Sequence, residues 1–170
     1  MKIELDLKTI KRNSELKENE NLRFRSFLKG KDTERIDKKA HLLYENVLDF
    51  VDCTECGNCC IELETSFHER EIDNLCKFLN IDKDEFIKQN TKTSEFAEKN
   101  TLILKSKPCQ FLENKKCTIY SHRPEECSSY PYLHKSNFNS RLFGVLDNYG
   151  ICPIVYNVFE LLKFELNFRS

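Results

Sequence analysis

Four cysteines stand within eight residues of one another, in the order Cys-x-x-Cys-x-x-Cys-Cys: Cys53, Cys56, Cys59 and Cys60. Thiolates are the ligands that soft metal ions and iron–sulfur clusters select. Gly57 lies inside this run, and a glycine can adopt the positive backbone dihedrals that let a short loop turn around a bound centre. The spacing therefore predicts a metal site, but it specifies no reaction.

Four further cysteines follow at wider intervals: Cys109, Cys117, Cys127 and Cys152. Cys152 precedes Pro153, a residue favoured at the first position of a helix. Its thiol is therefore expected at a helix N-cap, where the helix dipole favours a thiolate and suits a metal ligand. The ninth cysteine, Cys76, falls among apolar residues at helical spacing, and it is expected to pack in the core as a small hydrophobe.

Nine cysteines in 170 residues could also indicate a disulfide framework. The first residues, however, lack the apolar stretch behind a basic start that marks a secretory signal. The longest apolar run, at 151–156, is far too short to span a membrane. We therefore expect a cytoplasmic protein with reduced thiols. The net charge of -1 and a pI of about 6.4 imply no nucleic-acid partner.

The elements that must position these cysteines suggest an α+β fold, mainly helical, with a short hairpin or small sheet. A helix begins at Asp32 or Thr33 and leads directly to Cys53, and a shorter helix is expected at 16–28. We predict a polar helical extension at 1–31 and one cysteine-cluster domain at 32–170. A strand at 61–63 is followed by a helix capped by Ser66 and Glu69, and Asp82 opens another helix.

The third part of the chain contains a strand at 102–104 and a hairpin that carries two cysteines. A three-residue loop at 114–116 would place Cys109 and Cys117 on the same face, because side chains alternate along a strand. A centre shared by these two thiols therefore predicts an odd loop or a bulge. A helical turn follows Arg123, and the last helix begins at Cys152.

Few other side chains suggest chemistry. Arg123 could offset the negative charge of a thiolate centre, or it could pair with a nearby glutamate. His122 could ligate a metal, although the cysteines alone supply enough ligands. No serine–histidine–acid arrangement, phosphate loop or His-Glu-x-x-His signature is present, so no catalytic residue is identified.

The cysteine run and the motifs around the later cysteines, such as Arg123-Pro124-Glu125-Glu126-Cys127 and Cys152-Pro153, resemble the YkgJ-type or CxxCxxCC family over about 50–160. The resemblance implies a zinc- or iron-chelating domain in which eight cysteines act as ligands. They are Cys53, Cys56, Cys59, Cys60, Cys109, Cys117, Cys127 and Cys152. The family also includes flagellin lysine N-methylases, which implies a methylase-like enzyme as a further alternative.

Ligand spacing bears on which centre is bound. Structural zinc usually shows two short ligand pairs, whereas only the first run here has such spacing. Three thiols at Cys-x-x-Cys-x-x-Cys with a distant fourth before a proline resemble the ligands of a four-iron cluster. The sequence therefore favours an iron–sulfur protein with a redox or accessory role. The alternative is a zinc-stabilised module that binds a protein partner, and the division of the eight thiols among centres is left open.

Overall fold

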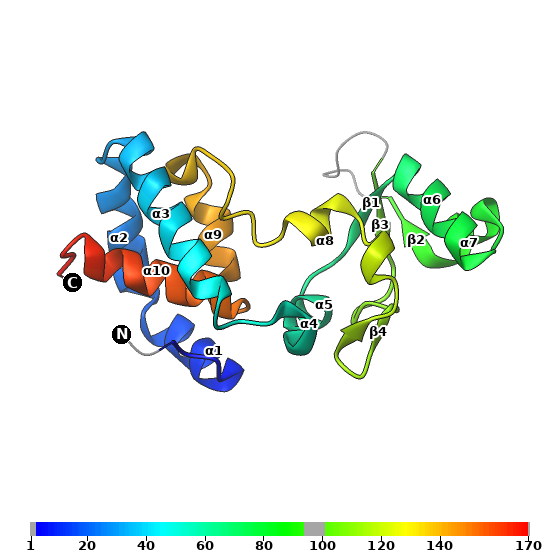
Figure 1. Cartoon of the computed structure of the whole chain (residues 1–170), viewed down its shortest axis with the longest axis horizontal. Coiled ribbons are helices and arrows are strands. Elements are labelled where there is room, and N and C mark those ends of the chain that lie inside the picture. The colour runs from blue at the N-terminus through cyan, green and yellow to red at the C-terminus, as the bar shows by residue number, and fades with distance from the viewer. Residues whose placement is uncertain (1–2, 94–100, 170) are drawn as a thin grey trace. The chain divides into compact units, whose positions relative to one another are not determined.

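The computed structural model describes residues 3–93 and 101–169 (Figure 1). Two compact units make up the chain. We call Met1–Asp52 with Pro131–Ser170 the terminal unit, and Cys53–Tyr130 the cysteine unit. The expected class is confirmed, since the chain is mainly helical with small antiparallel sheets. The predicted boundary between an extension and a domain at residue 31 stays a prediction.

The terminal unit is built from helices. They are α1 (Leu7–Leu16), α2 (Glu18–Lys29), α3 (Thr33–Leu48), η2 (Phe138–Ser140), α9 (Leu142–Tyr149) and α10 (Pro153–Glu165). The Asp32 side chain accepts a hydrogen bond from the Arg35 N–H at 2.8 Å, which confirms the predicted start of α3. Pro153 at the first turn confirms the predicted start of α10. Helices α3 and α10 pack against each other in this unit (Figure 1).

A buried ion network accompanies this helical core. The Lys163 ammonium, with 7% of its side chain exposed, lies 2.6 Å from a carboxylate oxygen of both Glu20 and Glu160. Tyr149 donates to Glu160 at 2.8 Å, and Lys17 pairs with the same carboxylate. Each buried charge therefore has an opposite charge beside it, which buried ions require.

The cysteine unit combines short helices with two small sheets (Figure 1). Its helices are α4 (Cys53–Cys56), α5 (Asn58–Glu62), α6 (Glu69–Leu79), α7 (Lys83–Asn90), η1 (Tyr120–His122) and α8 (Glu125–Ser129). Its strands are β1 (Ser66–His68), β2 (Thr91–Lys92), β3 (Thr101–Leu104), β4 (Leu112–Glu113) and β5 (Lys116–Cys117). The first sheet is antiparallel in the order β1-β3-β2, with Ser66 opposite Ile103 and Thr91 opposite Leu104.

A small apolar core lies between this sheet and its helices. It contains Phe67, Ile72, Leu75, Cys76, Phe86, Leu104, Phe111 and Ile119. Cys76 is 3% exposed, which confirms its predicted place on the apolar face of α6. Cys109 and Cys117 pack against the edge of the same core. The core and the candidate ligands are therefore contiguous.

Two predictions for the segment after the cysteine run are wrong. Residues 61–63 do not form a strand, because α5 continues to Glu62 and the Leu63 N–H still bonds to the Cys59 carbonyl at 2.9 Å. The capping box of α6 uses His68 and Glu71 rather than Ser66 and Glu69. Ser66 instead lies in β1, and its N–H donates to the Glu126 carboxylate at 2.7 Å. This distant partner competes with the local capping pattern.

The hairpin lies where it was predicted, but its loop is not the odd one that strand alternation would require for a centre shared by Cys109 and Cys117. Leu112 lies opposite Cys117, so the loop is the two residues Asn114 and Lys115, with φ of 48° and 66°. Positive φ at both positions is typical of the turns that match the twist of a two-residue hairpin. Cys109 lies before β4, in a turn closed by the Leu112 N–H and the Cys109 carbonyl at 3.0 Å. Strand alternation therefore does not decide where its thiol points.

Within the described ranges, no single helix is long and apolar enough to cross a membrane. Helices α9 and α10 pass the same length and composition test only as a pair, bent by 116°. Most of α10 is buried inside the protein.

Candidate metal centre

The cysteine run folds into two short helices joined by Gly57. Its φ is 62°, and a Cβ added there would lie 2.9 Å from the Lys115 carbonyl oxygen and 3.3 Å from Leu112 Cδ1. Glycine is therefore needed both for the backbone turn and for the close approach of the β4–β5 hairpin. An ion pair between Lys116 and Glu55, at 3.2 Å, joins the same two segments.

Hydrogen bonds also join distant segments beside the cysteines. The Cys109 N–H donates to the Cys60 carbonyl at 2.8 Å, which joins the run to the turn before β4. One oxygen of the Glu71 carboxylate accepts from the Glu125 N–H at the start of α8, at 2.7 Å. With the Ser66–Glu126 contact, these bonds hold the short helix that carries Cys127 against β1 and α6.

Four thiols from these segments act electrostatically on one another, and we call them the inner cysteines: Cys60, Cys109, Cys117 and Cys127. Burial, and then the charge of the Cys60 thiolate, raises the pKa of the Cys127 thiol to about 12. Burial likewise raises the pKa of Cys109 and Cys117, and the Cys60 charge adds to the rise. Ionising these thiols together is therefore unfavourable without added positive charge.

Each inner cysteine has a hydrogen-bond donor at its sulfur. The Phe111 N–H donates to Cys109, and the Ile119 N–H donates to Cys117, in each case from two residues further along the chain. A hydrogen bond from Cys59 lowers the pKa of Cys60 to about 7, although burial opposes this shift. The Thr65 side chain bonds to both Cys109 and Cys127. Such donors stabilise thiolates and metal-bound sulfur.

Arg123 and His122 lie beside the hairpin and have separate partners. The Arg123 guanidinium stacks on the Tyr120 ring at 3.7 Å and donates to the Tyr120 carbonyl at 2.9 Å. Its positive charge lowers the pKa of Cys117, although burial raises that pKa more. The His122 ring stacks on Phe78 with centroids 3.9 Å apart. Arg123 thus supplies positive charge near the inner cysteines, and His122 packs on α6.

The donor set fits a soft metal centre. Its sulfurs are half-buried, carry N–H and O–H donors, and come from segments held by backbone hydrogen bonds. In the part of the chain that the structure describes, no three His, Cys, Asp or Glu side chains are already arranged to hold an ion. Binding a metal would therefore require the thiols to turn toward a common point.

Comparison with known families places these motifs in a wider group. Residues 52–145 match the family model CxxCxxCC, described as a "putative zinc- or iron-chelating domain", and this range is more than half of the chain. The chain belongs to the CxxCxxCC family. The matched range contains the whole cysteine unit of this CxxCxxCC protein. No solved structure matches the chain.

The other predicted ligands of the CxxCxxCC protein are Cys53, Cys56, Cys59 and Cys152. Cys53 and Cys56 are the first and last residues of α4, three positions apart and thus on one helix face. Cys59 neighbours Cys60 in α5. Cys152 belongs to the terminal unit, where it is 6% exposed and is the N-cap residue of α10. It lies beyond the range that the family model matches.

Sequence reasoning missed Thr65, Glu71 and Glu126 as parts of the site. Thr65 bonds to two thiols, and the two glutamates fix the helix that carries Cys127. None of the three forms a local motif with a cysteine, apart from the adjacency of Glu126 to Cys127. That adjacency, in an Arg-Pro-Glu-Glu-Cys stretch, is the one signal that could have suggested a role for Glu126.

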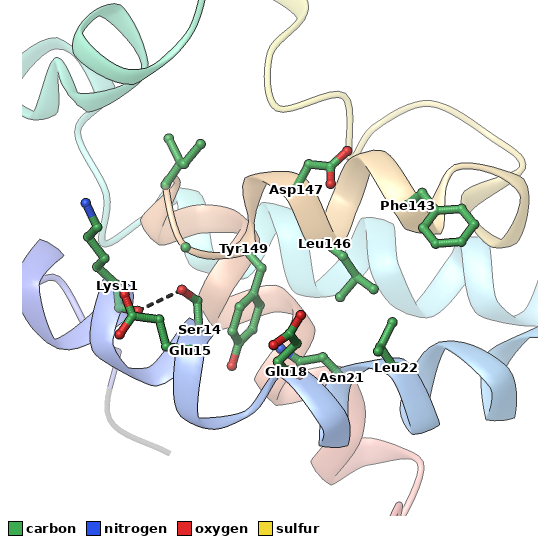
Figure 2. Close-up of a pocket in the computed structure, with 12 residues that line it drawn as sticks. Lys11, Ser14, Glu15, Glu18, Asn21, Leu22, Phe143, Leu146, Asp147 and Tyr149 are labelled. Atoms are coloured by element: carbon green, nitrogen blue, oxygen red, sulfur yellow. Dashed lines mark hydrogen bonds between the residues drawn. The ribbon is translucent and has the colours of Figure 1, made fainter.

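The terminal unit of the CxxCxxCC protein contains a separate cavity of about 500 Å³ between α1, α2 and α9 (Figure 2). Figure 2 shows Glu15, Glu18 and Asp147 among the polar side chains that line it. None of the residues that line this cavity is a cysteine.

Proposed function

We propose that this protein binds iron, as an iron–sulfur cluster, through cysteine thiolates, and that it has a redox role or assists a modification reaction. The proposed ligands are the eight cysteines Cys53, Cys56, Cys59, Cys60, Cys109, Cys117, Cys127 and Cys152. The observation that carries the proposal is the set of inner cysteines, which are half-buried and come from segments of which two are joined by the hydrogen bond from the Cys109 N–H to the Cys60 carbonyl at 2.8 Å. A cationic centre would offset the charge of such a group when its thiols ionise.

The hydrogen bonds to sulfur support an iron–sulfur cluster in particular. Donors such as the Phe111 and Ile119 N–H groups are among the features that set the reduction potential of such clusters. The Cys-x-x-Cys-x-x-Cys spacing of the first run supports the same centre. Cys152 enters the proposal from the sequence pattern, and its place at the N-cap of α10 favours a thiolate.

A zinc-stabilised module that binds a protein partner is the second candidate. The packing of Cys109 and Cys117 against the small apolar core favours it, because structural zinc stabilises a fold whose core is limited. In that case every centre would be closed by four ligands, and the metal would contribute folding free energy without taking part in a reaction.

Metal analysis of the protein purified without oxygen separates the two candidates. We expect iron and acid-labile sulfide in similar amounts, together with broad visible absorption from sulfur-to-iron charge transfer. A colourless protein that contains zinc and no sulfide would refute the iron–sulfur cluster and support the zinc module. A purified protein that contains none of these and takes up none on reconstitution would contradict both.

Two single substitutions provide a matched test of the ligand assignment. Cys127→Ser should remove at least one centre, because it replaces an inner thiolate with a hydroxyl that binds soft metals poorly. Cys76→Ala should retain the full metal content, because this thiol is 3% exposed in the apolar core on α6. Both variants are measured for metal per chain beside the wild type. Loss of metal in Cys76→Ala alone would overturn the assignment.

A further inference from the structure

We infer that the cavity between α1, α2 and α9 of the terminal unit binds a small organic cation of the polyamine class, in which ammonium groups are separated by short hydrocarbon chains. None of the residues that line the cavity is a cysteine, so this ligand would be additional to the metal of the proposed function. Three features of the cavity support such a ligand: its size and fixed floor, its apolar walls, and the charges on its lining.

The cavity has the size of a small-molecule site, and two buried side chains form its floor. Its volume of about 500 Å³ lies within the range of roughly 300–1,000 Å³ that is typical of such sites. The floor consists of Tyr149 and Asn21, which are 1% and 4% exposed. Tyr149 donates to Glu160 at 2.8 Å, and the Asn21 side chain accepts from Lys163 at 2.6 Å. These contacts fix the floor before a ligand binds, which lowers the entropy cost of binding.

Apolar side chains form the walls of the cavity (Figure 2). Leu22 of α2 and Phe143 of α9 are 44% and 61% exposed, and Leu146 of α9 is half-buried. The Arg25 guanidinium covers one face of the Phe143 ring, 3.6 Å from its centroid. Because a cation of the protein already occupies that face, the ring contributes apolar surface to the cavity rather than a second cation–π site. Such walls suit the hydrocarbon part of a ligand.

The charged side chains that line the cavity are three carboxylates and one ammonium. They are Glu15, Glu18, Asp147 and Lys11, and all four are exposed. Within residues 3–93 and 101–169, none of these three carboxylates forms an ion pair, whereas Glu160 of the neighbouring network pairs with Lys163. Three negative charges against one positive charge leave the lining with an excess of negative charge. This excess is complementary to a cationic ligand.

The walls and the charges together match one class of ligand. An inorganic cation would pair with the carboxylates but would gain nothing from the apolar walls, and a neutral hydrocarbon would leave the carboxylates unpaired. Glu15 lies on α1, Glu18 on α2 and Asp147 on α9, so the negative charges come from three different helices. A polyamine offers several ammonium groups to such carboxylates and places its methylene groups against the walls.

Calorimetric titration of spermidine into the full-length, metal-loaded protein tests the charge of the site. We expect one spermidine to bind per chain at low ionic strength, with an affinity that falls as salt is added. Glu18→Gln should lower this affinity about 2- to 5-fold, the range that one exposed ion pair contributes. Glu45→Gln is the matched control, because this exposed carboxylate of α3 does not line the cavity. Equal losses in the two variants, or no binding to the wild type, would overturn the inference.

The cavity itself is tested by filling it while its charges stay in place. Leu22→Trp should lower the affinity for spermidine by about 10-fold or more, because the added ring and the ligand would occupy the same volume. Leu42→Trp, at a side chain of α3 that is 63% exposed and does not line the cavity, should leave the affinity unchanged. Mg²⁺ should bind more weakly than spermidine, and a neutral diol of similar length should not bind. Mg²⁺ binding as tight as that of spermidine, or spermidine binding that is unchanged in Leu22→Trp, would reveal a diffuse acidic surface and overturn the inference.

Discussion

The terminal unit and the cysteine unit both bury ionisable groups, but they balance them differently. In the terminal unit, the Lys163 ammonium faces Glu20 and Glu160 at 2.6 Å. In the cysteine unit, the inner cysteines are half-buried, and burial raises the pKa of three of them. Arg123 is a cation whose charge acts on one of these thiols. The comparison indicates that Lys163, Glu20 and Glu160 balance one another in the first unit, whereas the thiols of the second would gain a counter-charge from a bound metal.

The apolar cores of the terminal unit and the cysteine unit also differ. Phe24, Tyr149 and Phe159 are fully buried in the terminal unit, and their rings contact one another between helices of up to sixteen residues. In the cysteine unit the buried cluster borders directly on Cys109 and Cys117, and the helices that carry Cys56 and Cys127 have four and five residues. Such short helices are not stable by themselves. Under the proposed function, metal ligation would supply additional stability there.

The largest effect in the terminal unit is expected from Phe159→Ala. This ring is 0% exposed and packs edge-on against Phe24 with centroids 5.1 Å apart. Its loss should lower the free energy of unfolding by about 3–5 kcal/mol, measured by urea denaturation of the metal-loaded protein. The folded variant should keep the wild-type metal content per chain. Loss of metal in proportion to the lost stability would contradict the separation of the two units.

A somewhat smaller effect is expected from Glu160→Gln. Burial raises the pKa of Glu160, but hydrogen bonds from Lys163 and Lys17 outweigh it and lower that pKa below its ordinary value of 4.5. The carboxylate therefore stabilises the fold above pH 4.5, and this stabilisation is lost as the pH falls below that value. The substitution should cost on the order of 3 kcal/mol at pH 7.

The measurement is the free energy of unfolding of wild type and Glu160→Gln between pH 7 and pH 3. The difference between them should shrink below pH 4.5, since the wild-type carboxyl is then protonated as well. A difference that stays constant over this range would show that the ionised carboxylate does not stabilise the terminal unit. The claim that the terminal unit balances its buried charges with opposite charges would then be wrong.

The smallest of these effects is expected from Gly57→Ala in the cysteine unit. The added Cβ would lie 2.9 Å from the Lys115 carbonyl oxygen, at a φ of 62° that alanine adopts poorly. We expect a loss of about 1–3 kcal/mol in stability, together with weaker metal binding, measured by thermal unfolding and chelator competition.

Gly144→Ala is the matched control for this substitution. Gly144 lies in α9 of the terminal unit, and a Cβ added there meets no atom within 4 Å. Alanine should stabilise the helix by about 0.5–1 kcal/mol and leave metal affinity unchanged. If both substitutions changed metal affinity equally, Gly57 would have no special part in the cysteine run.

The sequence predicted the elements whose signals are local. Asp32 caps α3, Asp82 caps α7, and Pro153 opens α10, because each signal acts within one helical turn. The apolar periodicity around Cys76 also sufficed to place that thiol in the core. These features can be predicted from the local sequence, without information about the rest of the chain.

The site could be predicted less well because its geometry depends on distant partners. Ser66 bonds to Glu126, sixty residues away, instead of capping α6. The register of the hairpin is fixed by a two-residue turn at Asn114 and Lys115, and Cys109 lies outside the strand. Thr65 meets two thiols that come from separate segments of the chain. No local pattern encodes such contacts, although the cysteine spacing did identify the CxxCxxCC family.

Hydrogen exchange of the full-length protein, read by mass spectrometry with and without bound metal, tests the central claim most directly. The metal-free sample is prepared without oxygen by dialysis against a chelator. The Cys127→Ser variant, treated with the same chelator, serves as the control for this metal-free sample. Metal should slow exchange in peptides from the cysteine unit, such as α6 and β3, while peptides from α1 and α2 keep their protection in both samples. Exchange that is unaffected by metal in the cysteine unit, or that changes only in the terminal unit, would contradict the account.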